Sequence, residues 1–280
     1  MSDLAQKLIA QNKRTRERFL ALGNCGLTQI PAEIAELHWI ESLSFASAWR
    51  KWNGRDWEEK RSRNSGEPNP LSHLAHLSRL LGLRSLVLDG TEVSDLTLLA
   101  NQVSLRSLSV ARTHITNLNP LASLASLQSL DASRTLASSL IPLAGLTALR
   151  KLDISNTRVG NLAPLAKLGA LQWLFVSNTI VSRLAPLANL AALKSLDARG
   201  TYVSDLTPLA NLAVMESLDV RGTYVNDLAP LSNLAFLKSL RPQNRHFAAT
   251  RASPREVAPG GPGQAMNPRS RTHGRRRVEP

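Results

Sequence analysis

Two pairs of side chains have the types and spacing to do chemistry. His73 and His76 are three residues apart, as two metal ligands on a helix would be. No carboxylate or third ligand stands near them, so we interpret them as residues of a solvated turn. Asp131 and Asp153 are 22 residues apart, and on neighbouring strands of one parallel sheet they would lie about 4.8 Å from each other. At that distance they could bind a cation or shift each other's pKa values. We expect solvated carboxylates beside arginines instead.

The sequence contains none of the common enzyme motifs that we sought. It has no Gly-x-x-x-x-Gly-Lys-Ser/Thr phosphate loop, no Gly-x-Ser-x-Gly, no His-Glu-x-x-His and no paired cysteines for zinc. We therefore expect no enzymatic activity and no cofactor. The single cysteine, Cys25, excludes an intrachain disulfide and favours a reducing compartment. We expect Cys25 to be a buried, inert thiol, the alternative being a reactive cysteine.

The elements that would position these residues are repeats of 22 residues. One column of the repeat holds leucine in seven successive units: Leu86, Leu108, Leu130, Leu152, Leu174, Leu196 and Leu218. Five residues later stands a column of threonines: Thr91, Thr113, Thr135, Thr157, Thr179, Thr201 and Thr223. A proline column follows, at Pro120, Pro142, Pro164, Pro186, Pro208 and Pro230. Such regular self-similarity indicates a repeat architecture.

Each column predicts a local structure. The Leu-x-Leu pair has a period of two, which predicts a short strand, and the strands of successive units would form one parallel sheet. The threonine stands where the chain leaves the strand, so its hydroxyl can satisfy backbone groups that the turn buries. The Pro-Leu-Ala-x-Leu-x-x-Leu segment has leucines three apart, which favours a 3-10 turn or a very short helix. Because this outer segment is wider than a strand, the stack would curve with its sheet on the concave face.

This pattern resembles the leucine-rich-repeat family. The segment "VSDLTPLANLAVMESLDV" resembles the 22-residue repeats of internalins and of a phosphatase regulatory subunit, with threonine where the family usually has asparagine. The unit "LALGNCGLTQIPAEIAELHWIESLSF" resembles repeats at the start of bacterial multidomain proteins, including the Roco GTPases. The resemblance implies an α/β fold, a leucine-rich-repeat solenoid with a curved parallel sheet on the concave face and 3-10 turns or short helices on the convex face.

Five segments are predicted along the chain. They are an N-terminal capping helix in 1–19, a first repeat in 20–45, a tryptophan-containing loop and an irregular repeat in 46–82, regular repeats in 83–240, and a disordered basic tail in 241–280. The loop contains Trp49, Trp52 and Trp57. We expect these tryptophans to pack back on the solenoid, the alternative being a role in binding.

The net charge of +13 comes mostly from residues 241–280, which hold nine arginines and two glutamates. This segment is rich in proline and poor in large apolar residues, so it is predicted to be disordered. One interpretation is a basic tail that binds nucleic acid or acidic lipid. We favour the other, a truncated or frame-shifted end, because the repeat stops within its strand.

The strand residues that point away from the core predict a binding face. In one unit, two large aromatic side chains, Trp173 and Phe175, project from a face that otherwise carries serine and aspartate. Aromatic residues flanked by charges are typical of a binding hot spot, and lone surface hydrophobes are the alternative. The charged residues assigned to this site are Lys151, Asp153, Asp197, Arg199, Asp219, Arg221 and Arg134.

These observations favour a protein-interaction scaffold that binds a protein partner on its concave face. We expect a cytoplasmic, monomeric, bacterial protein without membrane association, and it could be the recognition part of a larger signalling protein. One alternative is an internalin-like secreted effector or adhesin. The other is nucleic-acid binding, which we expect only through residues 241–280.

Overall fold

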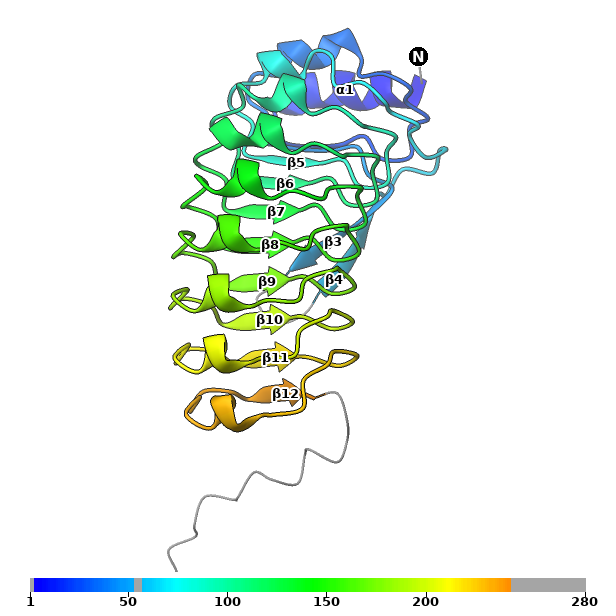
Figure 1. The fold of residues 1–280 in the computed structure, drawn as a ribbon. Helices are drawn as coiled ribbons and strands as arrows, with labels where there is room; N and C mark the ends of the chain where they lie inside the picture. Colours follow the sequence, from blue (N-terminus) through cyan, green and yellow to red (C-terminus); the bar gives the residue numbers. More distant parts are fainter. Residues whose placement is uncertain (1–2, 53–56, 243–280) are drawn as a thin grey trace, which may run out of the picture.

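The chain folds into a solenoid in which one short strand from each repeat joins a continuous sheet (Figure 1). The computed structural model describes residues 3–52 and 57–242. The predicted fold class is confirmed, since a parallel sheet alternates with 3-10 turns along the whole stack. Residues 243–280, on which the prediction of a disordered tail depends, lie outside the described residues.

The main sheet has ten parallel strands in the order β1-β2-β5-β6-β7-β8-β9-β10-β11-β12. Equivalent residues of successive repeats pair in register, as Leu130 does with Leu152. The strands are β1 (Phe19–Ala21), β2 (Ser42–Ser44), β5 (Ser85–Val87), β6 (Ser107–Ser109), β7 (Ser129–Asp131), β8 (Lys151–Asp153), β9 (Trp173–Phe175), β10 (Ser195–Asp197), β11 (Ser217–Asp219) and β12 (Ser239–Arg241).

Short 3-10 helices form the opposite side of the stack. Proline occupies one of the first positions in most of them, where its missing N–H costs no hydrogen bond. They are η1 (Ala32–Glu36), η2 (Leu77–Arg79), η3 (Thr97–Leu99), η4 (Asn119–Ser123), η5 (Ile141–Leu143), η6 (Ala163–Leu165), η7 (Ala185–Leu187), η8 (Thr207–Leu209) and η9 (Ala229–Leu231).

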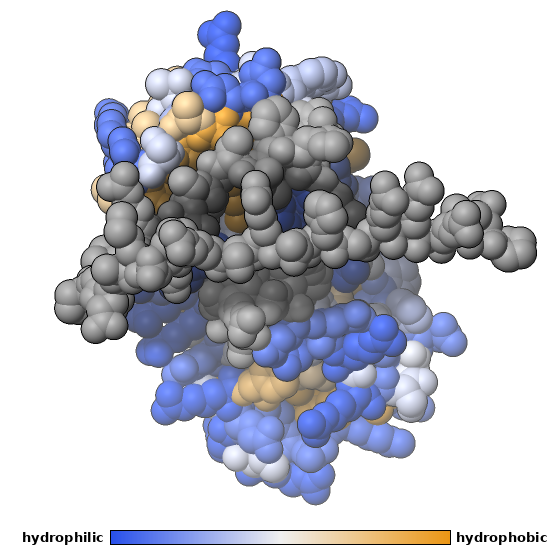
Figure 2. Space-filling model, turned by 90° about the horizontal axis from the view of Figure 1, so that it is seen from below, coloured by the Kyte–Doolittle hydropathy of each residue, from blue (hydrophilic) through white to orange (hydrophobic). Residues whose placement is uncertain are grey.

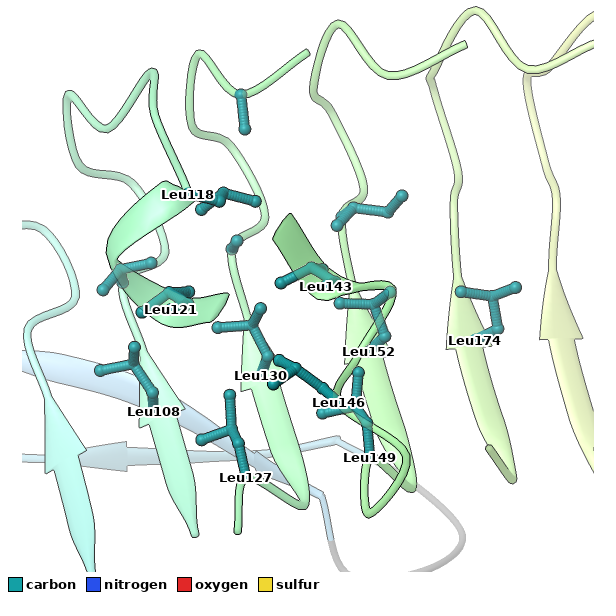
Figure 3. Packing of buried hydrophobic residues seen from close by; sticks show 14 of the residues in the cluster. Leu108, Leu118, Leu121, Leu127, Leu130, Leu143, Leu146, Leu149, Leu152 and Leu174 are labelled. Carbon is teal, nitrogen blue, oxygen red and sulfur yellow. The ribbon is translucent and has the colours of Figure 1, made fainter. Parts of the chain in front are cut away.

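A single core of leucines runs between the sheet and the 3-10 turns. Figure 3 shows leucines of successive units, such as Leu130 and Leu152, pointing into this shared interior. Both side chains are fully buried. Each unit therefore buries its apolar side chains largely against the units on either side of it, as expected of a solenoid.

The threonine column satisfies the interior turns, as predicted from the sequence. Every one of the seven hydroxyls donates to the carbonyl oxygen three residues earlier, at 2.6–2.7 Å, and all seven threonines are buried. Thr157, for example, donates to Ile154 O at 2.7 Å. Backbone carbonyls that would otherwise be buried without a partner are thereby paired.

The N-terminal end is built differently. The helix α1 (Asp3–Thr15) packs Ala5 and Ile9 onto the core. Cys25, at the threonine position of the first repeat, is buried as expected, and burial raises the pKa of its thiol, which disfavours the reactive thiolate. At this end of the solenoid, Asn69 takes the part that the threonine column plays in the later repeats.

Asn69 reaches into the interior turn from a later part of the chain. Its Oδ1 accepts hydrogen bonds from the backbone N–H groups of Cys25 and Leu27 at 3.1 and 2.8 Å. Its Nδ2 donates to the carbonyls of Leu22 and Phe45, both at 2.7 Å. One buried amide thus satisfies four backbone groups of the first two repeats.

The prediction of a loop after residue 45 is wrong in its conformation. Strands β3 (Ala48–Trp52) and β4 (Trp57–Arg61) form an antiparallel two-stranded sheet, inserted directly after β2. Residues 53–56 lie outside the described part. The hairpin runs obliquely along the main sheet, on the side away from the leucine core (Figures 1 and 3). Arg112, which follows β6 and is distant from the hairpin in sequence, bonds the carbonyl oxygen of Ala48 and helps to hold the hairpin there.

Within the described ranges, no helix has the length and apolar character needed to cross a membrane.

Candidate functional site

The concave face is formed by strand side chains that point away from the leucine core. One row of this face contains Ser44, Val87, Ser109, Asp131, Asp153, Phe175, Asp197 and Asp219, which pair in register from strand to strand. The hairpin β3–β4 covers the N-terminal half of this face. The C-terminal half, from β10 to β12, carries rows of charged residues.

A hollow of about 600 Å³ lies between the hairpin and the sheet, and we call it the roofed hollow. Trp49 and Lys60, a cross-strand pair of the hairpin, form its roof. Its floor and walls come from successive strands of the sheet and from Phe19. They include Ser42, Ser44, Ser85, Val87, Ser107, Ser109, Gln128, Ser129, Asp131, Arg150, Lys151 and Trp173. Arg112 holds the hairpin in place by donating from Nη2 to the carbonyl oxygen of Ala48 at 2.8 Å.

The C-terminal half, which we call the open half, is defined by Asp197, Arg199, Asp219, Arg221 and Arg241. Arg221 Nη2 lies 2.7 Å from Asp219 Oδ2, and its Nε also donates to Oδ1 at 3.0 Å. Arg199 Nη2 lies 3.1 Å from Asp197 Oδ2. Burial raises the pKa of Asp197, and neighbouring Asp219 adds to this, whereas the Arg199 backbone N–H and guanidinium oppose it. Both pairs hold exposed arginines in defined orientations.

The two aromatic residues predicted to form a hot spot differ in exposure. Phe175 is only 6% exposed, so it does not project as a free contact. Trp173 is half-buried and lines the roofed hollow. Lys151 and Asp153 are buried, whereas Arg134 is exposed and lies with Phe175 at a second hollow of about 540 Å³. The predicted residues thus divide between the roofed hollow and the surface beyond it.

The expectation of solvated carboxylates on this face is wrong. Asp131 and Asp153 are buried. Asp131 Oδ1 accepts from the backbone N–H of Ser133 at 3.0 Å and from its hydroxyl at 2.6 Å. Asp153 Oδ1 accepts from the N–H of Ser155 at 2.9 Å. The carboxylates cap the turn that follows each strand, which the repeat spacing alone did not indicate.

Among the described residues, no group of three or more His, Cys, Asp or Glu side chains is placed to hold a metal ion. His73 and His76 are both exposed, as expected of a solvated turn.

Sequence reasoning missed Asp89 as a titratable group. It is buried after β5, and its Oδ1 accepts from the N–H of Ala111 at 3.3 Å. Burial and, to a lesser extent, the charge of Asp131 raise its pKa to about 7, against the opposing influence of the Ser109 hydroxyl and Arg112. The signal was a lone aspartate in a column that holds alanine, serine or arginine in the other units.

A ridge of exposed apolar side chains was also missed. The residues directly after the threonine column include Leu136, Ile180, Tyr202 and Tyr224, all of them exposed. The rings of Tyr202 and Tyr224 stack with centroids 6.0 Å apart. Seen from the C-terminal end, the described surface is mostly hydrophilic, with hydrophobic residues gathered in separate places (Figure 2). The 22-residue alignment could have found this ridge, since Tyr202 and Tyr224 are equivalent positions.

The fold and this face define a class of protein: an open repeat solenoid whose sheet presents one extended surface. No protein-family model and no curated protein matches the sequence. Among solved structures, internalin C2 of Listeria monocytogenes is 32% identical, with a TM-score of 0.61, over 61% of this chain and 76% of that one. The chain therefore belongs to the leucine-rich-repeat family.

Two further structures are similar in fold alone. An internalin (inlF) of Listeria monocytogenes is 22% identical over 86% of this chain and 75% of that one, with a TM-score of 0.66. A leucine-rich-repeat protein of Leptospira interrogans is 19% identical over 88% of this chain and 59% of that one, with a TM-score of 0.72.

Proposed function

We propose that this protein is an interaction scaffold that binds a protein partner on the concave face, with the open half as the main contact. The observation that carries the proposal is the pair of exposed arginines, Arg199 and Arg221, each oriented by an aspartate two residues before it. Arginine held in a fixed orientation is favoured at interfaces because it loses little conformational freedom on binding. Exposed ion pairs add little to stability, so a contribution to recognition is a better explanation of this arrangement.

The stacked Tyr202 and Tyr224 support the same proposal. They come from the same two repeats as Arg199 and Arg221, and their rings are exposed. Tyrosine and arginine are the residue types enriched among interface hot spots. Trp173 and Arg134 extend the proposed contact surface toward the hairpin, whereas the buried Lys151, Asp153 and Phe175 support the surface from below.

The experiment is affinity capture from the native host with the full chain, followed by direct binding of each captured protein. Replacing Arg199 and Arg221 together by serine should weaken partner binding at least tenfold. The matched control replaces Lys167 and Arg183, two exposed cations outside the strands, by serine. Equal binding by the wild type and the Arg199/Arg221 variant, with unchanged circular dichroism, would refute the open half as the contact.

An internalin-like secreted effector or adhesin is the second candidate, favoured by the 32% identity with internalin C2. Detecting the tagged chain in the culture supernatant of the native host, and not in its cytosol, would support this candidate. The cytoplasmic location, the monomeric state, the bacterial signalling role and the binding of nucleic acid by residues 241–280 stay predictions.

A further inference from the structure

The roofed hollow contains polar atoms that have no partner in the described protein. Oδ2 of Asp131 and the hydroxyl of Ser44 are buried and make no hydrogen bond. Both residues line the hollow, and they are 4% and 1% exposed. Buried polar groups in folded proteins nearly always have a hydrogen-bond partner, because leaving one unpaired costs about 1–3 kcal/mol. These two atoms therefore indicate a ligand that hydrogen-bonds at both places.

The distance between these atoms sets the minimum length of the ligand. Ser44, Val87, Ser109 and Asp131 are consecutive partners in one row of the sheet. Three strand spacings of about 4.8 Å separate the first from the last, which gives about 14 Å. An extended peptide covers that distance with about four or five residues. The hollow continues past Asp131 to Trp173 on β9, two strands further along.

The hairpin borders the hollow through side chains of one face. Strands β3 and β4 pair only with each other in the described structure, so each has an outer edge without a neighbouring strand. The Arg112 bond to Ala48 O occupies one outer carbonyl. The hollow, however, lies under the face of the hairpin that carries Trp49 and Lys60, so a segment in the hollow would contact these side chains and not a strand edge.

The charges of the hollow favour an acidic segment. Lys60, Arg150 and Lys151 line it together with one carboxylate, Asp131. Lys60 is paired with Glu58 at 2.8 Å, whereas Arg150 is exposed and has no ion pair within the described ranges. Trp49 and Trp173 add apolar surface for a large side chain.

We propose that the roofed hollow binds an extended, acidic polypeptide segment, which lies between the hairpin and the sheet. A backbone N–H or a hydroxyl of the segment donates to Asp131 Oδ2, a second group bonds Ser44, and carboxylates of the segment lie near Arg150 and Lys60. This inference rests on the proposed function, because it assigns the segment to the protein partner. It adds a second contact that is separate from the open half.

The test uses a library of random 12-residue peptides displayed on phage and selected against the full chain. Enriched peptides are then synthesised, and their dissociation constants are measured by fluorescence anisotropy. We expect net-acidic sequences whose affinity falls with increasing salt. Asp131→Asn keeps Oδ1 and replaces the unpaired oxygen by an amide NH₂, so it should weaken binding at least tenfold.

Two further variants keep the inference falsifiable if a substitution in the sheet perturbs folding. Lys60→Glu reverses a charge on the hairpin and should also weaken binding at least tenfold. Lys167→Glu makes the same change at an exposed position outside the hollow and should alter binding less than twofold.

Several outcomes would overturn the inference. One is peptides that bind Asp131→Asn and Lys60→Glu as tightly as the wild type. Another is the absence of any enriched peptide in the selection. If the peptides lose affinity only when Arg199 and Arg221 become serine, the open half stands and the hollow fails. If the peptides lose affinity only in the hollow variants, and captured partners bind the Arg199/Arg221 variant as tightly as the wild type, the hollow is supported and the open half is refuted.

Discussion

The two halves of the concave face are made from the same repeat and differ in what lies over them. In the N-terminal half, the hairpin β3–β4 covers serines, Asp131 and Lys151 and leaves a hollow. In the C-terminal half, the same strand positions carry Asp197 and Asp219, which orient exposed arginines. A regular scaffold can thus present an enclosed site and an open surface, because a single insertion changes the exposure of residues in neighbouring repeats.

The interior shows the same contrast. From β5 to β11, the turn after each strand is satisfied by the threonine of its own repeat. At the N-terminal end, Asn69 alone serves four backbone groups of two repeats. The first arrangement divides the hydrogen bonding among many equivalent sites. The second assigns four bonds to one residue, with Asn64 and Ser62 bonding the nearby carbonyls of Ala21 and Gly23, so a single substitution at Asn69 should have a larger effect than one in the threonine column.

The largest expected effect is therefore at Asn69. Asn69→Ala leaves two N–H groups and two carbonyls unpaired in the interior, so the free energy of unfolding should fall by about 4 kcal/mol. Urea denaturation of the full chain would measure it, with hydrogen exchange showing whether the loss is confined to residues 3–82. A loss below about 1 kcal/mol would mean that the N-terminal interior does not depend on this residue.

The next largest effect concerns pH and Asp89. Its pKa in the folded protein, about 7, lies above the unfolded value of 3.8, so the folded state holds a proton that the unfolded state has lost. The contribution of this group to stability is therefore greatest at low pH and declines as the pH rises from about 4 to about 7. Asp89→Asn keeps the acceptor for Ala111 N–H and removes the charge, so it should raise stability at pH 8 by on the order of 2 kcal/mol.

Thermal melts of the wild type and the Asp89→Asn variant between pH 5 and 8 would check this. The advantage of the variant should shrink as the pH falls toward 5. Asp95→Asn is the contrasting control, because hydrogen bonds from Thr97 lower the pKa of that exposed carboxyl. A constant difference between wild type and Asp89→Asn across this range would contradict the assignment.

A smaller effect is expected for one member of the threonine column. Thr157→Val keeps the shape of the side chain and leaves Ile154 O without its donor, so the free energy of unfolding should fall by about 1.5 kcal/mol. Equilibrium unfolding would measure the change. The result is to be compared with that for Asn69→Ala. Equal losses of unfolding free energy would show that the N-terminal turns depend on one residue no more than the later turns do.

A feature of this structure could be predicted from the sequence when residues close together in the sequence determine it. The leucine and threonine columns are local patterns, and the strands, 3-10 turns and interior hydrogen bonds follow from them. The pairing within the hairpin is also local, and the Asn53-Gly54 dipeptide between its two strands was a signal for it that sequence reasoning did not use. The position of the hairpin over the sheet is not local, since Arg112 bonds Ala48 O from 64 residues away. Because the position of the hairpin was not predicted, the exposure of the strand residues beneath it could not be predicted either. Asn69 was missed for the same reason, since its partners lie 24–47 residues away.

The smallest expected effect tests whether the hairpin is held as a separate element over the repeats. Arg112→Ala removes the 2.8 Å bond to Ala48 O and should cost about 1 kcal/mol of local stability. Arg134→Ala is a matched control, because Arg134 occupies the same column, has a similar positive φ (56° against 58°) and makes no such bond in the described structure. Both substitutions therefore share any backbone cost, and their difference isolates the hairpin contact. Hydrogen exchange of the β3 and β4 amides should become faster in Arg112→Ala alone. Equal exchange rates of these amides in the two variants would mean that packing of Trp49 and Lys60, and not the Arg112 bond, holds the hairpin in position.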